Sequence, residues 1–307
     1  MIKVFIDGSA GTTGLRIREM LGRREDVTLL TLPEALRKDR EARREAINAA
    51  DAVFLCLPDD AAREAAGLVE NEHTVVIDAS TAHRVADGWA YGFPELSAAH
   101  RDAVRKGKRI ANPGCYASGF IALVYPLIAA GIAPKDYPFV CHAVSGYSGA
   151  GKKGIAEYEA AERSPLYDTP RLYALSLEHK HLPEMRKVCS LTRTPVFCPY
   201  VCDYYCGMTV SVPLFSELLC VKATAADVKE VLRAHYDGSY FISVGEEPSG
   251  YVSANTLNGT NRMELLVGGG EERILLTARF DNLGKGASGA AIQNMNLALG
   301  LDERLSL

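Results

Sequence analysis

The segment that decides the fold is Ile2-Lys3-Val4-Phe5-Ile6-Asp7-Gly8-Ser9-Ala10-Gly11-Thr12-Thr13-Gly14. Residues 2–6 are nearly all apolar, as in a buried parallel strand, and residues 15–21 place apolar side chains at helical spacing. A strand, a glycine loop and a helix in this order are typical of dinucleotide-binding domains, in which backbone N–H groups at the helix start bind a pyrophosphate. The glycine spacing is G-x-x-G-x-x-G rather than the commoner G-x-G-x-x-G, and an ordinary strand-to-helix turn is the alternative.

Strands and helices continue to alternate after this segment. Apolar runs at 52–57 and 74–78 flank a helical stretch at 59–69, for which Asp59 is the expected N-cap. This alternation predicts a doubly wound parallel sheet.

The carboxyl ends of these strands carry residues suited to ligand binding, because ligands of such sheets bind there. Leu57 and Pro58 follow one strand, and Ser80 follows the next. Arg84 lies slightly further along and is a candidate for binding an anionic substrate, with an ordinary surface arginine as the alternative.

The strand at residues 27–30 bears on the choice of nucleotide. An NAD site usually ends this strand with an acid that binds the ribose hydroxyls. No acid stands at this strand end, whereas Arg37 and Lys38 follow nearby. The segment therefore favours NADP, with a solvated helix start as the alternative.

A second decisive stretch is Asn112-Pro113-Gly114-Cys115-Tyr116-Ala117-Ser118-Gly119. The Pro-Gly pair marks a tight turn, and the apolar run at 120–128 predicts a buried helix. Cys115 thus lies where a strand turns into a helix, and the unpaired N–H groups and positive dipole end there favour a thiolate. We expect Cys115 to be a nucleophile; a small buried cysteine is the alternative.

The second half of the chain has a different pattern. Residues 139–145 predict a strand, and the glycine-rich loop 146–154 with two cations could pack beside a nicotinamide or bind phosphate, or act as a connector. Residues 207–215, 262–267 and 273–280 predict antiparallel strands.

These patterns predict two domains. The first is a Rossmann-type α/β domain of residues 1–114 and 284–307, since the small residues around 284–291 and the last helix could return to it. The second, 115–283, is an inserted α+β domain with a mainly antiparallel sheet.

The segment Leu177-Glu178-His179-Lys180-His181-Leu182-Pro183-Glu184-Met185 precedes a short helix in which Pro183 fits the first position. One of its two imidazoles could be the general base that partners Cys115. Cys198, Cys202 and Cys206 are spaced by four, but they fall in a strand-like segment, too extended to share one ion. We expect no metal site.

Composition excludes several classes of protein. The chain has 307 residues, 48% of them hydrophobic, and a net charge of −4. This balance disfavours a dedicated nucleic-acid binder, and no apolar run reaches membrane-spanning length. The first strand starts at residue 2, which leaves no room for a signal peptide, so the eight cysteines are expected to be reduced thiols in the cytoplasm.

Taken together, these stretches resemble the N-acetyl-gamma-glutamyl-phosphate reductases, particularly their shorter second type, within the aspartate-semialdehyde dehydrogenase superfamily. The resemblance covers nearly the whole chain. It rests on the cysteine signature at 112–119, the His-x-His-x-Pro-Glu segment at 179–184 and the Asp-Asn-Leu-x-Lys-Gly-Ala segment at 281–287. Ser118 stands where the longer type usually has threonine.

The resemblance implies an NADPH-dependent enzyme of arginine biosynthesis, a homo-oligomer acting on a small-molecule acyl phosphate. Cys115 would form a thioester that accepts hydride, and His179 or His181 would protonate the sulfur, with His179 favoured. Further residues that the patterns and the resemblance suggest fall into two groups. For the cofactor they are Gly8, Ser9, Ala10, Gly11, Thr12, Thr13, Gly14, Leu57, Pro58, Ser80, Ser145, Gly146, Asn282, Lys285 and Gly286. For the substrate they are Asn112, Arg84, Lys180 and Glu184.

Three other functions stay open at this point. Another phosphorylating semialdehyde dehydrogenase, such as the aspartate enzyme, lacks the His-x-His-x-Pro-Glu segment. A thiol hydrolase would need no glycine loop, and a non-catalytic NADP sensor would need no cysteine–histidine pair. Sequence leaves open NADP against NAD, the oligomeric state, the choice between His179 and His181, and whether the acyl group is free or carrier-bound.

Overall fold

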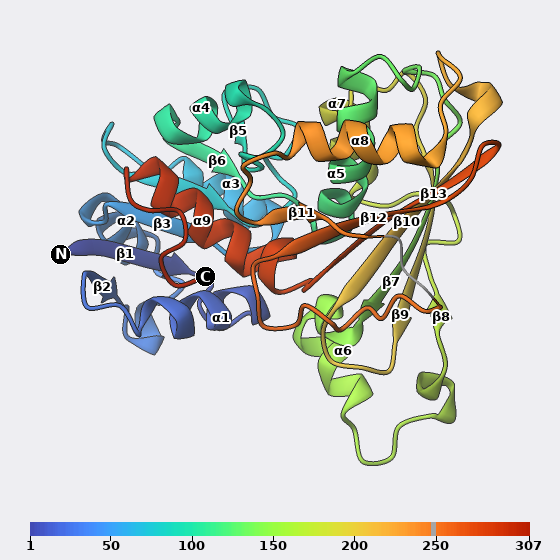
Figure 1. Ribbon diagram of the computed structural model, residues 1–307. Helices are drawn as coiled ribbons and strands as arrows, with labels where there is room; N and C mark the ends of the chain where they lie inside the picture. The colour runs from blue at the N-terminus through green and yellow to red at the C-terminus, as the bar shows by residue number, and fades with distance from the viewer. Residues whose placement is uncertain (247–249) are drawn as a thin grey trace. The chain divides into compact units, whose positions relative to one another are not determined.

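A computed structural model describes residues 1–246 and 250–307. It contains two compact units, Met1–Gly114 with Ala287–Leu307, and Cys115–Gly286 (Figure 1). The boundary expected between residues 283 and 284 falls a few residues before the observed one, which lies inside the π-helical turn Gly284–Ser288.

The first unit contains a parallel six-stranded sheet with the order β2-β1-β3-β4-β6-β5. Its strands are β1 (Ile2–Asp7), β2 (Val27–Leu30), β3 (Ala52–Leu55), β4 (Val75–Asp78), β5 (Ala90–Tyr91) and β6 (Arg109–Ala111). Its helices are α1 (Thr12–Leu21), α2 (Arg40–Ala49), α3 (Asp59–Ala66), α4 (Ala98–Lys106) and α9 (Gly289–Ala298). This is the predicted doubly wound sheet.

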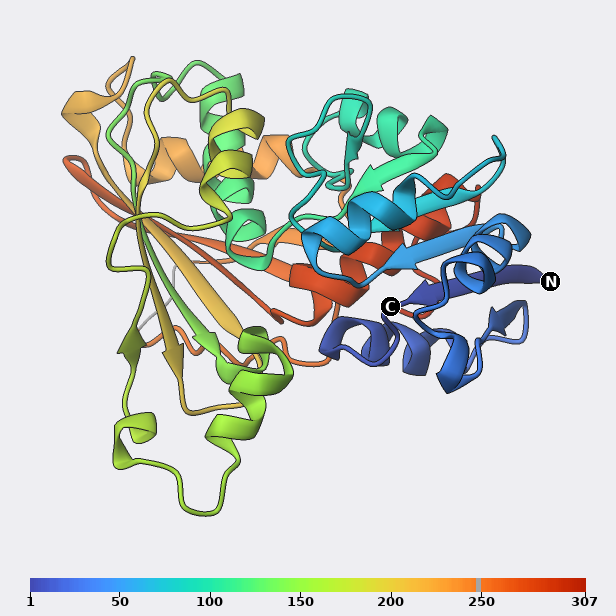
Figure 2. The same ribbon diagram turned by 180° about the vertical axis from the view of Figure 1, so that it is seen from behind.

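Both faces of this sheet are covered, which explains why its strands are apolar throughout (Figures 1 and 2). Side chains on a strand alternate between faces. Val4 and Ile6 pack with α1, α4 and α9, whereas Phe5 packs with α2 and α3. Helix α9 therefore belongs to the core of the first unit, although it follows the second unit in sequence.

The second unit contains a mixed seven-stranded sheet with the order β11-β12-β13-β10-β7-β9-β8. The pairs β7/β9 and β11/β12 are parallel, and the others are antiparallel. The strands are β7 (Val140–Gly146), β8 (Arg171–Leu172), β9 (Val196–Cys202), β10 (Met208–Phe215), β11 (Ile242–Val244), β12 (Met263–Gly269) and β13 (Arg273–Phe280). The predicted fold class, a Rossmann-type domain with an inserted α+β domain, is confirmed.

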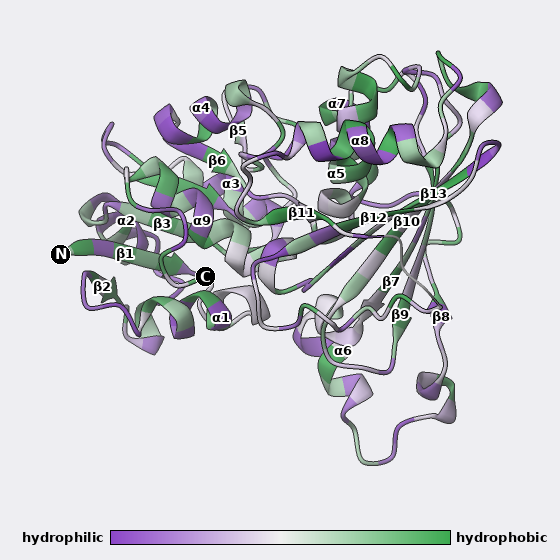
Figure 3. Cartoon of the chain, in the orientation of Figure 1, coloured by the Kyte–Doolittle hydropathy of each residue, from purple (hydrophilic) through white to green (hydrophobic). Residues whose placement is uncertain are grey.

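Helices α5 (Cys115–Ala129), α7 (Leu182–Val188) and α8 (Ala225–His235) pack together, with α5 and α8 on the sheet of the second unit. Helix α8 alternates green and purple in Figure 3 and buries its apolar side through Val228 and Leu232. On the opposite face of the sheet, the side chains of Leu275 and Phe215 are exposed, whereas Thr277 on the same face is buried.

Two local expectations were wrong. The glycine-rich stretch 146–154 is not a loop: it forms a 3₁₀ turn, Tyr147–Ala150, followed by α6 (Gly151–Tyr158). The rings of Tyr147 and Tyr158 stack with their centres 4.8 Å apart and connect the turn to the end of the helix. Asp59 does not cap α3, since its carboxylate accepts hydrogen bonds from the N–H and hydroxyl of Thr81.

Within residues 1–246 and 250–307, no helix has the length and hydrophobicity needed to span a bilayer.

Candidate active site

Cys115 is the first residue of α5, as the turn-helix pattern predicted. Its surroundings are tight: a Cβ added to Gly286 would lie 2.9 Å from the Cβ of Cys115, so only glycine fits beside it. The thiol is partly exposed, while most of α5 behind it is buried. The sulfur thus stands at the N-terminal end of a fixed helix, where the dipole is positive.

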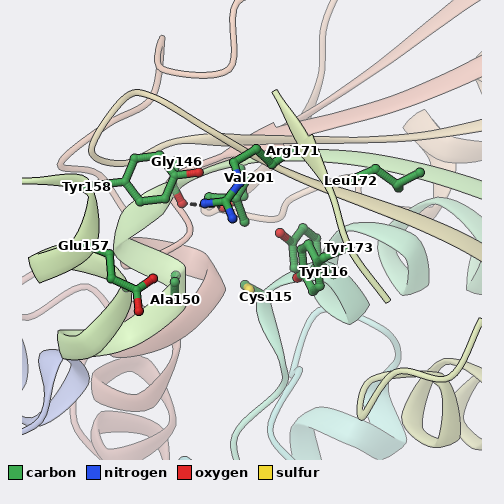
Figure 4. Close-up of a pocket in the computed structure, with 13 residues that line it drawn as sticks. Cys115, Tyr116, Gly146, Ala150, Glu157, Tyr158, Arg171, Leu172, Tyr173 and Val201 are labelled. Carbon is green, nitrogen blue, oxygen red and sulfur yellow. Dashed lines mark hydrogen bonds between the residues drawn. The ribbon is translucent and has the colours of Figure 1, made fainter. Parts of the chain in front are cut away.

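Cys115 opens into a cavity of about 270 Å³ within the second unit. In Figure 4, Glu157, Tyr158, Arg171 and Tyr173 lie around the same open space as its sulfur. The cavity is lined by Cys115, Tyr116, Ser145, Gly146, Gly149, Ala150, Gly154, Glu157, Tyr158, Arg171, Leu172, Tyr173 and Val201. A nucleophile facing a partly apolar, partly charged cavity is the arrangement of a substrate site.

The two predicted histidines lie beside the residue that follows the nucleophile. The ring of Tyr116 is 5.9 Å from the ring of His179 and 5.8 Å from that of His181. His181 is buried, whereas His179 is half-buried. The backbone N–H of His181 donates to Nδ1 of His179 at 3.1 Å, so a neutral His179 carries its proton on Nε2.

Burial raises the pKa of two tyrosines in this region. The Tyr116 hydroxyl is almost wholly desolvated, and its pKa lies well above the ordinary value. Desolvation likewise raises the pKa of Tyr173. Both phenols therefore stay protonated through neutral pH and can donate hydrogen bonds, but they do not act as bases.

The other predicted substrate residues fall into two places. Arg84 and Asn112 meet in the first unit, where Nε of Arg84 donates to the carbonyl oxygen of Asn112 at 3.0 Å. The Asn112 amide donates to the Ala287 carbonyl at 3.0 Å. Lys180 is exposed and Glu184 is buried in α7, and neither lines the Cys115 cavity.

The predicted nucleotide loop lines a second cavity, of about 510 Å³, in the first unit. Gly8 has φ of +85°, and a Cβ there would lie 2.3 Å from the Cys56 carbonyl oxygen, so this turn requires glycine. The cavity is lined by Phe5, Ile6, Asp7, Gly8, Ser9, Ala10, Arg18, Leu29, Leu30, Thr31, Leu32, Pro33, Glu34, Arg37, Lys38 and Leu57. This cavity therefore brings Gly8, Ser9 and Ala10 of the expected loop together with three cationic side chains, those of Arg18, Arg37 and Lys38.

The remaining predicted cofactor residues of the first unit follow β1, β3 and β4, three neighbouring strands of the parallel sheet. Gly11 precedes α1, where Thr12, Thr13 and Gly14 form the first turn. Pro58 precedes α3 as its N-cap. The Ser80 hydroxyl donates to Oδ2 of Asp78 at 2.7 Å, and this carboxylate also contacts Nδ1 of His83 at 2.6 Å. The sequence did not single out that buried Asp78–His83 pair.

Five predicted cofactor residues lie in the second unit. Ser145 and Gly146 line the Cys115 cavity. Asn282 uses its amide within the unit, accepting from the Gly207 N–H at 2.8 Å and donating to the Ser148 hydroxyl at 2.9 Å. Lys285 is buried with its amine 5.5 Å from the centre of the Phe241 ring, and Gly286 contacts Cys115.

The cysteines form no metal centre: among the described residues, no group of three or more His, Cys, Asp or Glu side chains is arranged to hold an ion. All eight are free thiols. Cys141 and Cys189 are fully buried, and desolvation raises the pKa of both. Cys220 is exposed.

We expect iodoacetamide at pH 8 to alkylate Cys115 and Cys220 quickly and to leave Cys141 and Cys189 unmodified. The buried thiols keep their protons in the folded protein but ionise near the ordinary thiol pKa in the unfolded chain. The free energy of unfolding should therefore be greatest below that pH and should fall as the pH rises above it. Peptide mass mapping and urea unfolding at pH 8 and 10.5 measure both effects. Equal labelling of all four thiols in the folded protein would contradict this assignment.

The comparisons with known proteins match this arrangement. Residues 3–104 match the family model described as semialdehyde dehydrogenase, NAD binding domain, and residues 115–282 match semialdehyde dehydrogenase, dimerisation domain. An aspartate semialdehyde dehydrogenase II from Vibrio cholerae, in complex with ASA, superposes with a TM-score of 0.74 at 16% identity, covering 98% of each chain. The aspartate semialdehyde dehydrogenase with NADP from Candida albicans gives 0.67 at 16% identity, covering 97% of this chain and 98% of that one.

Fold and site together define a dehydrogenase with a nucleotide-binding domain and a cysteine-bearing second domain. Closer relatives are named N-acetyl-gamma-glutamyl-phosphate reductase. The Pseudomonas putida protein of that name is 47% identical, covering 97% of this chain and 96% of its own, and the Nostoc protein is 43% identical, covering 99% of both. The chain belongs to the semialdehyde dehydrogenase family, and within it to the N-acetyl-gamma-glutamyl-phosphate reductases.

Proposed function

We propose that this protein reduces N-acetyl-glutamyl 5-phosphate to N-acetylglutamate 5-semialdehyde and phosphate with NADPH, a step of arginine biosynthesis. One observation carries the proposal: Cys115 begins a buried helix, lines a cavity and is followed by Tyr116, whose ring contacts His179 and His181. The relatives of 43–47% identity that carry this name support the choice of substrate.

The first half-reaction uses the helix start at Cys115. The thiolate attacks the acyl carbon, a carbon–sulfur bond forms, the bond from carbon to the phosphate oxygen breaks, and inorganic phosphate leaves. The first turn of α5 points its N–H groups and the positive end of its dipole toward the sulfur, and this end of the helix is proposed to stabilise the oxyanion that develops on the acyl oxygen.

A reduced nicotinamide, when bound, supplies the hydride that reduces the thioester carbonyl. As the carbon–sulfur bond then breaks, His179 gives a proton to the sulfur and the aldehyde leaves. The hydrogen bond from the His181 N–H to Nδ1 of His179 fixes the ring with its proton on Nε2, so Nε2 is the atom that donates.

Arg84 and Asn112, which contact each other, are proposed to bind the phosphate or carboxylate of the substrate, with Lys180 and Glu184 as further candidates. The proposed cofactor contacts are those of the glycine loop and of the residues predicted with it. Asn282 would act by positioning the Ser148 turn, since its amide is used there.

NADP is proposed over NAD because Arg18, Arg37 and Lys38 line the first-unit cavity with the glycine loop. Such cations would bind the 2′-phosphate. We expect the Arg37→Ala, Lys38→Ala double variant to raise the KM for NADPH about tenfold or more with little change in kcat, because each charged hydrogen bond contributes about 1.5–3 kcal/mol. The KM for NADH should stay unchanged. Steady-state kinetics decide this, with the exposed Arg105→Ala as control; an equal loss with both nucleotides would contradict it.

A homo-oligomer is proposed, most simply a dimer formed by the face of the second unit's sheet that carries Phe215 and Leu275. Phe215 and Leu275 are 53% and 46% exposed on neighbouring strands, and the matching family model is described as a dimerisation domain. Leu275→Asp should shift the protein toward monomer in light scattering, whereas Leu166→Asp, on an exposed segment outside this sheet, should not. A monomeric wild type would contradict the proposal.

Cytoplasmic location is proposed because all eight cysteines are free thiols.

The reverse reaction tests the function, following NADP reduction with N-acetylglutamate semialdehyde and phosphate. Phosphate-dependent reduction with this aldehyde, and not with aspartate semialdehyde, is the expected result. Activity with aspartate semialdehyde alone would assign the protein to the aspartate enzymes. No activity with either aldehyde, together with tight NADPH binding, would indicate a nucleotide sensor or a carrier-bound substrate.

A further inference from the structure

The outer wall of the Cys115 cavity is built by a segment that the proposed reaction has not used. Residues 147–173 leave the sheet after β7, form α6 and return through the edge strand β8. Their tyrosines pack on one another: Tyr158 lies 4.8 Å from Tyr147, with which it stacks, and 4.8 Å from Tyr167, which it meets edge to face. This cluster fixes the cavity wall.

Among the residues that the structure describes, Arg171 is the one arginine that lines this cavity. Its guanidinium lies 4.1 Å from the centre of the Tyr167 ring, which sets the plane of the group. No carboxylate within residues 1–246 and 250–307 forms an ion pair with it, whereas the other arginine of the segment, Arg163, pairs with Asp168 and Asp203. Arg171 therefore presents an oriented cation to the cavity.

Tyr158 adds a second donor. Its side chain is only 5% exposed, and its hydroxyl lies beside the Arg171 guanidinium, whose hydrogen bond to it opposes the rise in the pKa of Tyr158 that burial causes. A guanidinium has no acceptor, and no acceptor for the Tyr158 hydroxyl proton lies within hydrogen-bond distance among the described residues, so an oxygen of a bound ligand can accept that hydrogen bond. Tyr158 lines the same cavity as Arg171 and Cys115.

We propose that Arg171 and Tyr158 together bind the α-carboxylate of the substrate, at the end of the cavity away from Cys115. This inference rests on the proposed function. A planar carboxylate matches the fork of a guanidinium, and the Tyr158 hydroxyl supplies a further donor to one of its oxygens.

The size of the cavity fits this occupant. The cavity volume of about 270 Å³ is near the lower end of the range of small-ligand sites, which suits a small acyl substrate. From the acyl carbon that Cys115 attacks to the α-carboxylate carbon there are four carbon–carbon bonds, which span about 5 Å when extended. A charge-assisted hydrogen bond from that carboxylate adds about 2.8 Å to the reach of the substrate.

Two other groups bear on the choice of anion. Glu157 also lines the cavity, and its Oε2 accepts a hydrogen bond from the Tyr167 hydroxyl at 3.2 Å, so the wall carries one acid beside its one arginine. That balance suits a singly charged carboxylate better than a phosphate. The phosphate is the competing occupant, and the test below separates the two.

The test compares two aldehydes in the phosphate-dependent reverse reaction. One is N-acetylglutamate semialdehyde, and the other is 4-acetamidobutanal, which lacks only the α-carboxylate. Wild type should prefer the first by about 100-fold in kcat/KM, as expected for an arginine–carboxylate pair. Arg171→Ala should lose that preference, because its kcat/KM should fall only with the carboxylated aldehyde. The preference of Arg171→Lys should lie between those of wild type and Arg171→Ala, and Tyr158→Phe should reduce the preference about fivefold. The KM for phosphate should not change.

Arg193→Ala, an exposed arginine of the second unit outside the cavity, is the matched control and should behave as wild type. If Arg171→Ala slows both aldehydes equally, or raises the KM for phosphate with both, the carboxylate assignment is overturned. If wild type itself uses neither aldehyde, the proposed function fails, which is a different outcome. Because Tyr158→Phe keeps the packed ring, it tests the hydroxyl even if an Arg171 variant folds poorly.

Discussion

Cys115→Ser is expected to lower kcat/KM by about 10⁴-fold or more, because enzymes that lose their nucleophile fall by that order. A serine hydroxyl is not ionised at the helix start, and an ester accepts hydride less readily than a thioester. The fold should be kept, since serine is no larger than cysteine and the Cys115 side chain is partly exposed. Steady-state kinetics of the reverse reaction measure the loss.

Two controls make the Cys115 result specific. NADPH affinity should be nearly unchanged, because the exchange of sulfur for oxygen leaves the glycine loop and the cations of the first-unit cavity intact. The matched variant Cys220→Ser, at an exposed thiol, should retain full activity. If Cys115→Ser kept more than about a tenth of the wild-type rate, covalent catalysis through this sulfur would be ruled out.

His179→Gln is the second large effect, with an expected loss of about 10²–10⁴-fold in kcat, the usual contribution of a general acid–base group. Glutamine has no titrating group, so it cannot pass a proton to the sulfur. Its side chain still offers an acceptor to the His181 N–H, which should preserve the turn before α7. Kinetics across pH measure the loss and should show that the variant lacks the titrating limb of the wild type.

The histidine assignment has its own comparison. His181→Gln is expected to lower thermal stability as well as activity, because His181 is buried at 4% exposure. The exposed His73→Gln serves as a neutral control. A larger kinetic loss at His181 than at His179, without loss of stability, would transfer the acid–base role to His181.

Local sequence signals predicted the parts of the molecule that local chemistry decides. The glycine loop after β1 was visible because a strand, a tight turn and a helix each leave their own pattern within about twenty residues. Cys115 was visible for the same reason, since Pro113 and Gly114 mark the turn before its helix. The histidine segment was visible because two imidazoles, a lysine and an acid fall within a few residues; its helix α7 begins at Leu182, one residue before the first position expected at Pro183.

The outer wall of the Cys115 cavity could not be predicted in this way. Arg171 lies on a strand of two residues, too short to show a period, and tertiary packing brings it to Cys115. Tyr158 ends a helix whose glycines predicted a loop, because local propensity carries no information on the stacking of Tyr147 against it. A cluster of aromatic residues between 147 and 173 was the one signal that could have pointed there.

The most direct test of the account is a single-turnover experiment with N-acetylglutamate semialdehyde and NADP in the absence of phosphate. We predict a burst of NADPH close to one per active site, a mass gain of one N-acetylglutamyl group on the peptide containing Cys115, and renewed turnover when phosphate is added. Continuous NADPH production without phosphate, or acylation at another residue, would contradict the thioester mechanism at Cys115.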